Sequence, residues 1–238
     1  TNKMKVEIWS DITCVHCYIA KRRFEKALFQ FKHIAQIEII WKSFELAPNL
    51  VVDHNQDMYQ FLANYNHASL EQVKVVCGQI ADTARKVGLK YNFDVAKPAN
   101  SFRAHRFSHL AKYNNIQDKA EEVLFKAHFT EGRNIDDTQT LIQLGVEIGL
   151  NENEVKKVME STQFTTEVKQ DVLDGQQLNI RGVPYYLFNR KLSVSGAQSE
   201  HTFLDTMEKA YSEWLEEVNK PNPLSEEGHT CKVGESCA

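Results

Sequence analysis

Two cysteines separated by two residues stand near the start of the chain, in the stretch Ile8-Trp9-Ser10-Asp11-Ile12-Thr13-Cys14-Val15-His16-Cys17. Apolar residues alternate with charged ones before the pair, which is typical of a strand from Val6 to Trp9. After the pair, the apolar residues from Tyr18 to Phe31 recur with helical spacing. Cys14 is therefore predicted to lie in the turn where a strand gives way to a helix.

This turn favours a reactive thiol. A cysteine at a helix N-terminus meets unpaired backbone N–H groups and the positive end of the helix dipole, which stabilise the thiolate and lower the thiol pKa. We therefore predict that Cys14 is a nucleophile and that Cys17, one turn into the helix, attacks the mixed disulfide that Cys14 forms. His16, between them, adds a positive or dipolar neighbour that stabilises the thiolate further.

The rest of the chain has three parts. A second strand is predicted at Ile37–Ser43, and its connection to the first is long enough for a parallel βαβ crossover. From residue 48 to 177 the pattern is helical throughout and has no strand signals, which indicates an all-helical insertion. Two short β runs, 180–188 and 192–196, then form a predicted hairpin, and an amphipathic helix follows at 199–218.

We therefore expect an α/β protein with a discontinuous domain, 4–47 and 178–218, interrupted by the helical domain 48–177. Residues 219–238 contain Pro221 and Pro223 and are predicted to be a flexible tail that carries Cys231 and Cys237.

The order β-α-β, helical insertion, β-β-α is the thioredoxin layout, and several motifs carry a family resemblance. The CxxC pair at 14–17 and Gly182-Val183-Pro184 look like the two active-site motifs of DsbA-like thiol oxidoreductases. Four further segments, 8–11, 18–24, 100–106 and 194–199, resemble the FrnE subfamily, whose members are typically cytosolic. The match runs from about Lys5 to Val218. Val15 departs from the family, which usually has proline at that position.

The resemblance implies roles for other residues. It implies that Pro184 is cis, faces the cysteines and keeps metals away from them, and that the backbone of Val183 pairs with an extended substrate. It places two segments near the substrate. These are Asn100, Ser101 and His105, which also fit an ordinary helix start, and Gly196, Ala197 and Gln198, which also fit an ordinary strand-to-helix turn.

The remaining cysteines and histidines have simpler interpretations. Cys14 and Cys17 could be half of a zinc site, but Cys231 and Cys237 do not form a second CxxC knuckle, so we expect no metal. The resemblance instead implies that Cys231 and Cys237 form an auxiliary redox pair, the alternative being a tail of free thiols. Cys77 is expected to be a buried small apolar residue. His105 and His109 have i, i+4 spacing but no accompanying glutamate, so we expect a structural pair.

Composition narrows the partners. The chain has 238 residues, 42% of them hydrophobic, and a formal net charge of -4, which fits a folded protein of one or two domains. Nucleic acid or an anionic membrane surface would favour clustered Lys and Arg, so we expect neither partner. Thr1 to Lys3 precede Met4 without an apolar leader, and we expect a cytoplasmic protein. A close cysteine pair in that reducing compartment is more often catalytic than structural.

Three functions are consistent with these observations. The first is a thiol-disulfide oxidoreductase or isomerase that acts on disulfide-containing proteins and small thiols such as glutathione, with no bound cofactor. The second is a glutathione-dependent isomerase or transferase like the related 2-hydroxychromene-2-carboxylate isomerases and kappa transferases, which generally have serine at the nucleophile position. The third is a redox-linked chaperone whose helical part offers an apolar groove.

Overall fold

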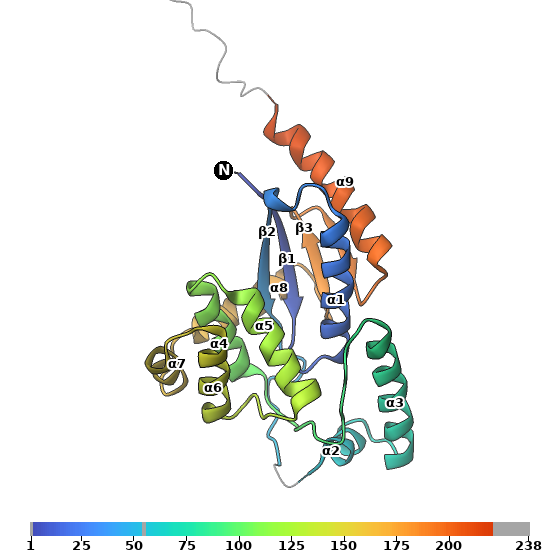
Figure 1. Cartoon of the computed structure of the whole chain (residues 1–238), viewed down its shortest axis with the longest axis vertical. Helices are drawn as coiled ribbons and strands as arrows, with labels where there is room; N and C mark the ends of the chain where they lie inside the picture. Colours follow the sequence, from blue (N-terminus) through green and yellow to red (C-terminus); the bar gives the residue numbers. More distant parts are fainter. Residues whose placement is uncertain (1, 54–55, 221–238) are drawn as a thin grey trace, which may run out of the picture.

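The computed structural model describes residues 2–53 and 56–220. A four-stranded sheet with the order β2-β1-β3-β4 forms the centre of one half of the molecule (Figure 1). Strand β1 (Met4–Ser10) pairs in parallel with β2 (Ile37–Ser43) and antiparallel with β3 (Tyr185–Phe188), which pairs antiparallel with β4 (Leu192–Ser195). This is the predicted thioredoxin fold, with its β-α-β and β-β-α halves.

Helices cover both faces of the sheet because the strands alternate their side chains. Val6 and Ile8 face α1 (Val15–Gln30) and α9 (Glu200–Val218) and pack in one core with Phe24 and Phe203. Trp9 points to the opposite face, where its indole Nε1 donates to the backbone oxygen of Asp171, 2.9 Å away. A short 3-10 turn, η1 (Ile34–Gln36), leads from α1 towards β2. The sheet is thus buried on both faces, as a parallel pair requires.

The part of the chain inserted between the two halves is helical, as predicted. Its elements are α2 (Met58–Tyr65), α3 (Leu70–Lys86), α4 (Phe102–Tyr113), α5 (Gln117–Lys126), η2 (Ala127–Glu131), α6 (Thr138–Ile148), α7 (Glu152–Met159) and α8 (Thr165–Gln177). Helices α4 to α7 lie beside the sheet domain, whereas α2 and α3 lie below α1 (Figure 1). Helix α8 contacts the sheet directly, because the Asp171 carboxylate accepts from Lys42 Nζ at 2.8 Å and from the Ser43 N–H at 3.0 Å.

The helix ends follow local capping chemistry. Ser69 and Gln72 form a reciprocal capping box at the start of α3, and the side chains of Asp137, Asn151 and Ser199 cap α6, α7 and α9. The first helix begins at Val15 rather than at Tyr18. The helical stretch that follows α4 divides into α5 and the π-helical turn η2.

The two parts share a core through α1. Tyr18 and Ile19 are buried with Phe107, Leu124 and Phe125 of the helical region.

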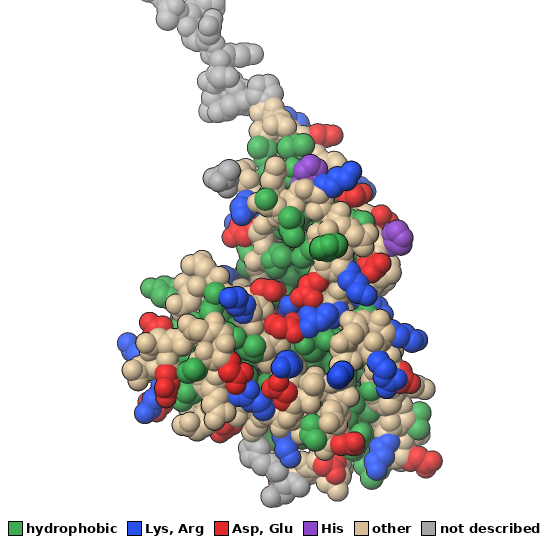
Figure 2. All heavy atoms as spheres, viewed as in Figure 1, with side chains coloured by type: hydrophobic (Ala, Val, Ile, Leu, Met, Phe, Trp, Pro, Cys, Tyr) green, Lys and Arg blue, Asp and Glu red, His purple; other side chains and the backbone are tan. Residues whose placement is uncertain are grey.

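An ion-pair cluster also joins α1 to α5. Lys21 is buried and has three carboxylates within ion-pair distance, those of Glu25, Asp118 and Glu122. Acidic and basic side chains gather together in this part of the surface, and they are interspersed over the face that Figure 2 shows. Among the described residues, no helix is both long enough and apolar enough to cross a bilayer.

Candidate active site

Cys14 is the N-cap of α1, directly after β1 and its turn. Its backbone is extended, and its N–H donates to the Asp11 carbonyl at 3.0 Å, which closes the turn. The Cys17 N–H donates to the Cys14 carbonyl at 3.0 Å, so Cys17 occupies the first helical turn. Both thiols are free, and Cys14 is 6% exposed against 1% for Cys17. Both residues are therefore buried, and Cys14 is the more exposed of the two.

The surroundings separate the two thiols electrostatically. A hydrogen bond from the Cys17 thiol is the largest cause that lowers the pKa of Cys14, and the backbone N–H groups of Cys17 and His16 add to it against the opposing effects of burial and Asp11. Burial raises the pKa of Cys17 well above that of an ordinary thiol, and the neighbouring Cys14 raises it further. Cys14 is thus favoured as the thiolate and Cys17 as the thiol.

The segment before β3 faces this pair. The Val183–Pro184 peptide is cis, as the resemblance implied, and the Cys14 Sγ lies 3.6 Å from the Val183 carbonyl oxygen. The Pro184 carbonyl accepts from the Gly196 N–H at 2.8 Å, which ties this segment to the end of β4. Proline offers no side-chain ligand or N–H at this position. The cysteine pair therefore meets a backbone carbonyl across the site.

A groove of about 510 Å³ opens beside the thiols, and we call it the dithiol groove. Its apolar wall comes mainly from α3 and includes Val73, Val76, Cys77 and Ile80. Cys14, Val15, His16 and Val183 form the opposite edge. Cys77 is 3% exposed, and burial raises its pKa, which fits the predicted buried apolar role. His16 is exposed at the edge of the groove.

The structure does not bring Asn100 and His105 to the groove as predicted. The Asn100 amide donates to the carbonyls of Pro48 and Leu50, and its Oδ1 accepts from the Phe102 N–H at 2.9 Å, so this side chain fixes the start of α4. His105 is buried, and its Nε2 lies 2.9 Å from the Phe44 carbonyl. Both side chains are used internally.

Ser101, the third predicted residue of this segment, lines a smaller pocket next to the groove. His109 is buried beside Asp171, with its Nε2 3.0 Å from the carboxylate, as a structural histidine.

The 196–198 turn, which the resemblance placed near the substrate, makes internal hydrogen bonds. The Gly196 N–H donates to Pro184, and the Gln198 N–H donates to the Gly196 carbonyl at 2.9 Å. The Ala197 carbonyl accepts from the Arg23 guanidinium. The structure therefore uses this turn to brace the cis-proline segment against α1.

Asp11 is a residue of the site that the sequence reasoning left without a role. It is fully buried, and its carboxylate accepts from the Thr13 N–H at 2.9 Å and from the Leu46 N–H at 2.7 Å. It thereby holds the turn before Cys14 against the segment that follows β2. Its position at the end of the strand pattern, directly after Ser10 and three residues before the first cysteine, is the signal that could have identified it.

Tyr91 is a second such residue, and it has no comparable signal in the sequence. Its hydroxyl donates to the Val15 carbonyl at 2.7 Å, so it fixes the backbone between the two cysteines. Tyr91 itself lies in the segment between α3 and α4, far from these cysteines in the sequence. Within residues 2–53 and 56–220, no three His, Cys, Asp or Glu side chains form a group that could hold a metal ion. Cys231 and Cys237 lie outside the described residues.

Comparison with known proteins identifies the family. A family model described as a DSBA-like thioredoxin domain matches residues 5–208. The chain belongs to the DSBA-like thioredoxin family. Among solved structures, it is similar to a probable DsbA oxidoreductase from Streptomyces coelicolor, with 31% identity and a TM-score of 0.83 over 99% of this chain and 96% of that one. It is also 26% identical to the protein YwbO of Bacillus subtilis, over 87% of this chain and 96% of that protein.

More distant structures share the DSBA-like fold. A 2-hydroxychromene-2-carboxylate isomerase is 17% identical, with a TM-score of 0.62 over 90% of this chain and 98% of that one. The cytosolic disulfide reductase DsbM from Pseudomonas aeruginosa, in a structure with GSH, is 16% identical, with a TM-score of 0.56 over the same shares of the two chains. These likenesses show the fold alone, and one fold can serve more than one kind of chemistry.

Proposed function

We propose that the protein is a thiol-disulfide oxidoreductase that exchanges disulfides with protein or small-thiol substrates through Cys14 and Cys17. One observation carries the proposal. The environment lowers the pKa of Cys14 at the edge of an open groove and raises the pKa of Cys17 directly behind it. This is the asymmetry that a nucleophilic and a resolving thiol need, because the thiolate is the attacking species.

The reaction has two balanced steps. The Cys14 thiolate attacks one sulfur of a substrate disulfide, so the substrate S–S bond breaks, a Cys14–substrate disulfide forms and the other substrate sulfur leaves as a thiolate. Cys17 then loses its proton and attacks Cys14 Sγ, which forms the Cys14–Cys17 disulfide and releases the second substrate thiolate. The substrate gains two electrons and the dithiol loses them. Burial opposes the deprotonation of Cys17, so we expect the second step to be the slower one.

The Val183 carbonyl suggests how a substrate is held. It lies 3.6 Å from Cys14 Sγ, next to the cis-proline, where an extended substrate segment can pair with the backbone. The apolar wall of α3 across the groove suits apolar residues that flank a substrate cysteine.

Glutathione is the proposed small-thiol partner, since two glutathione molecules reduce the Cys14–Cys17 disulfide and leave as oxidised glutathione. We further propose a cytoplasmic location and membership of the FrnE subfamily. A cytosolic glutathione poise of roughly -220 to -260 mV by extraction methods keeps a DsbA-like dithiol almost wholly reduced, so the protein acts there as a reductase or isomerase. Cys231 and Cys237 are proposed to form an auxiliary redox pair.

Trapping of the intermediate tests the mechanism. Cys17→Ala should accumulate a mixed disulfide on Cys14 when mixed with oxidised glutathione or a disulfide-containing protein, and Cys14→Ser should accumulate none at Cys17, which is enclosed. Peptide mapping by mass spectrometry locates the adduct. An adduct on Cys17 in the Cys14→Ser variant would show that Cys14 is not the required nucleophile. A paired Cys231→Ser and Cys237→Ser variant that leaves recycling by glutathione unchanged would remove the auxiliary role.

A glutathione-dependent isomerase is the second candidate, favoured by the shared fold with the 2-hydroxychromene-2-carboxylate isomerase. The two functions differ in their need for the second thiol. Isomerase turnover that requires glutathione and persists in Cys17→Ala would favour the isomerase, whereas disulfide exchange requires both cysteines.

A further inference from the structure

A second, smaller cavity of about 200 Å³ adjoins the dithiol groove, and we call it the His128 pocket. Thr13, Leu46, Leu62 and Asn66 line both spaces, so the two are neighbours across a common wall. Thr13 directly precedes Cys14 in the chain. The residue directly before the proposed nucleophile is therefore part of the wall of the His128 pocket.

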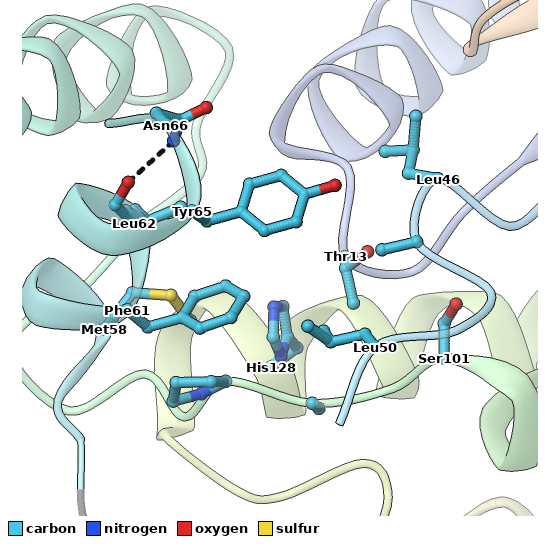
Figure 3. A pocket seen from close by; sticks show the side chains of 13 residues that line it. Thr13, Leu46, Leu50, Met58, Phe61, Leu62, Tyr65, Asn66, Ser101 and His128 are labelled. Carbon is cyan, nitrogen blue, oxygen red and sulfur yellow. Dashed lines mark hydrogen bonds between the residues drawn. The ribbon is translucent and has the colours of Figure 1, made fainter. Parts of the chain in front are cut away.

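The walls of the His128 pocket are mostly apolar. Helix α2 contributes the side chains of one face, at i, i+3, i+4 and i+7 spacing, which are Met58, Phe61, Leu62 and Tyr65. The rings of Phe61 and Tyr65 stack with centroids 5.7 Å apart and reach across the pocket from α2 (Figure 3). Leu46 and Leu50 lie on the opposite side (Figure 3). No Lys or Arg is among the described residues that line this pocket.

Thr13, Tyr65, Asn66 and Ser101 also bring polar side chains to this pocket, but among its described lining residues only His128 has a buried polar atom without a hydrogen-bond partner. Its imidazole extends into the pocket from the π-helical turn η2 (Figure 3), a kind of turn that is frequent at functional sites. The side chain is 2% exposed, and its Nδ1 is buried without a hydrogen-bond partner among the described residues. An unpaired buried polar atom costs about 1–3 kcal/mol, so the fold holds this ring in the pocket wall at a cost in stability.

The protonation state of His128 narrows the choice of that group. Burial lowers the pKa of His128 to about 4, so the ring is neutral at neutral pH. A neutral imidazole has one donor and one acceptor nitrogen, and Nδ1 is either of them, depending on the tautomer. A hydroxyl group both donates and accepts, so it pairs with either ring nitrogen in both tautomers. A carboxylate or phosphate would be buried here without a cation.

Size selects the rest of the ligand. An apolar cavity of about 150 Å³ accommodates benzene. A cavity of about 200 Å³ thus accommodates one aromatic ring with a hydroxyl group. We propose that the His128 pocket binds a hydroxyphenyl group, with the aromatic ring between Phe61, Leu50 and their neighbours and the hydroxyl on the His128 imidazole.

Two sources share this chemistry, a free phenol and the side chain of tyrosine. Binding of a phenol does not depend on the dithiol. A tyrosine beside a substrate disulfide would enter the pocket while the disulfide meets Cys14. This second source rests on the proposed function.

Fluorine NMR on the full chain tests the binding itself. We expect 4-fluorophenol to bind about twofold to tenfold more tightly than fluorobenzene, because one hydrogen bond adds about 0.5–1.5 kcal/mol. His128→Leu should remove this preference, and His128→Gln, which keeps a donor and an acceptor, should retain part of it. Equal affinities for the two probes in the unsubstituted protein, or a preference that survives in His128→Leu, would overturn the proposal. The comparison of the two probes needs no variant, so it stands even where His128→Leu fails to fold.

Location is tested by filling the pocket. Leu50→Trp should weaken the binding of both fluorinated probes, since the indole occupies the ring's place. Binding of 4-fluorophenol that is unchanged in a folded Leu50→Trp variant would place the probe elsewhere and overturn the assignment.

A comparison of disulfide substrates distinguishes the two sources of the hydroxyphenyl group. Matched disulfide peptides that carry Tyr or Phe next to the cysteine are compared as substrates, with hydroxyethyl disulfide as a control that has no ring. Faster exchange of the Tyr peptide, lost in His128→Leu, assigns a tyrosine side chain. Equal rates for the two peptides, together with the phenol preference, assign a free phenol. No exchange even with hydroxyethyl disulfide would remove the proposed function and leave the phenol-binding result intact.

Discussion

Cys17 should control the reactivity of Cys14 before any disulfide forms. The Cys17 thiol donates the hydrogen bond that contributes most to the lowered pKa of Cys14, and both side chains are almost fully buried. Cys17→Ala removes this donor, whereas Cys17→Ser keeps an O–H donor in the same turn. The two variants are therefore matched except for the hydrogen bond.

The size of the effect follows from general values. A hydrogen bond to a charged group is worth about 1.5–3 kcal/mol, which at a pH below the pKa changes the thiolate population about ten- to a hundredfold. Nucleophilicity rises as the pKa rises, with a Brønsted coefficient of about 0.4–0.5, and this recovers about half of the loss. We expect Cys14 in Cys17→Ala to react with iodoacetamide about threefold to twentyfold more slowly than in the reduced unsubstituted protein.

The assay measures the alkylation rate of Cys14 against pH, with peptide mapping by mass spectrometry to separate it from the other cysteines. In Cys17→Ser the midpoint of the profile should lie near that of the unsubstituted protein, and in Cys17→Ala it should move to higher pH. Circular dichroism confirms that each variant is folded. Profiles that coincide for Cys17→Ala and Cys17→Ser would show that this hydrogen bond does not set the reactivity of Cys14.

Two further predictions concern stability. Glu121 is buried with one carboxylate oxygen unpaired, and burial raises its pKa to about 7. Above the ordinary pKa of a glutamate, the folded state therefore keeps a proton that the unfolded chain has lost, and the free energy of unfolding falls as the pH rises. Urea unfolding should show a loss of up to about 3 kcal/mol between about pH 5 and 8, and this loss should be absent in Glu121→Gln. A pH dependence that Glu121→Gln leaves intact would contradict this. The second prediction compares two glycines that both have positive φ. Gly132→Ala should destabilise the fold by about 1–3 kcal/mol more than Gly149→Ala, because of the two only Gly132 would place a Cβ against a backbone oxygen, that of Val95 at 2.3 Å. Equal thermal midpoints for the two variants would show that the clash is relieved at little cost.

Local patterns in the sequence were sufficient for most of the fold. Strand β2 has the predicted bounds, and the hairpin of β3 and β4 lies within the predicted runs, since alternation and apolar periodicity are local signals. The π-helical turn η2 has no such signal. Its residues continue the helical pattern of α5, and the turn is set by tertiary packing. Helix α8 was expected within the insertion, but its Asp171 contacts bind it to the sheet.

The site was predictable only in part for the same reason. The CxxC pair at the strand-to-helix turn and the cis-proline segment are brought together by the sheet, as the thioredoxin layout implies. Whether a polar side chain faces a groove or the interior is decided by distant contacts, and this is where the predictions for Asn100 and His105 failed. Both side chains are bound to the segment after β2, and no spacing within α4 reveals that partner. His128 was missed because it lies in an apolar helical pattern without a motif.

Equilibration of the protein in graded glutathione redox buffers, with the state of each cysteine mapped by alkylation and mass spectrometry, tests the central claim most directly. We expect Cys14 and Cys17 to convert together, in one reversible transition, from two thiols to one internal disulfide. The midpoint should leave the pair mostly reduced at the cytosolic glutathione poise. Cysteines 14 and 17 that oxidise or acquire glutathione independently across the whole range would contradict the dithiol mechanism.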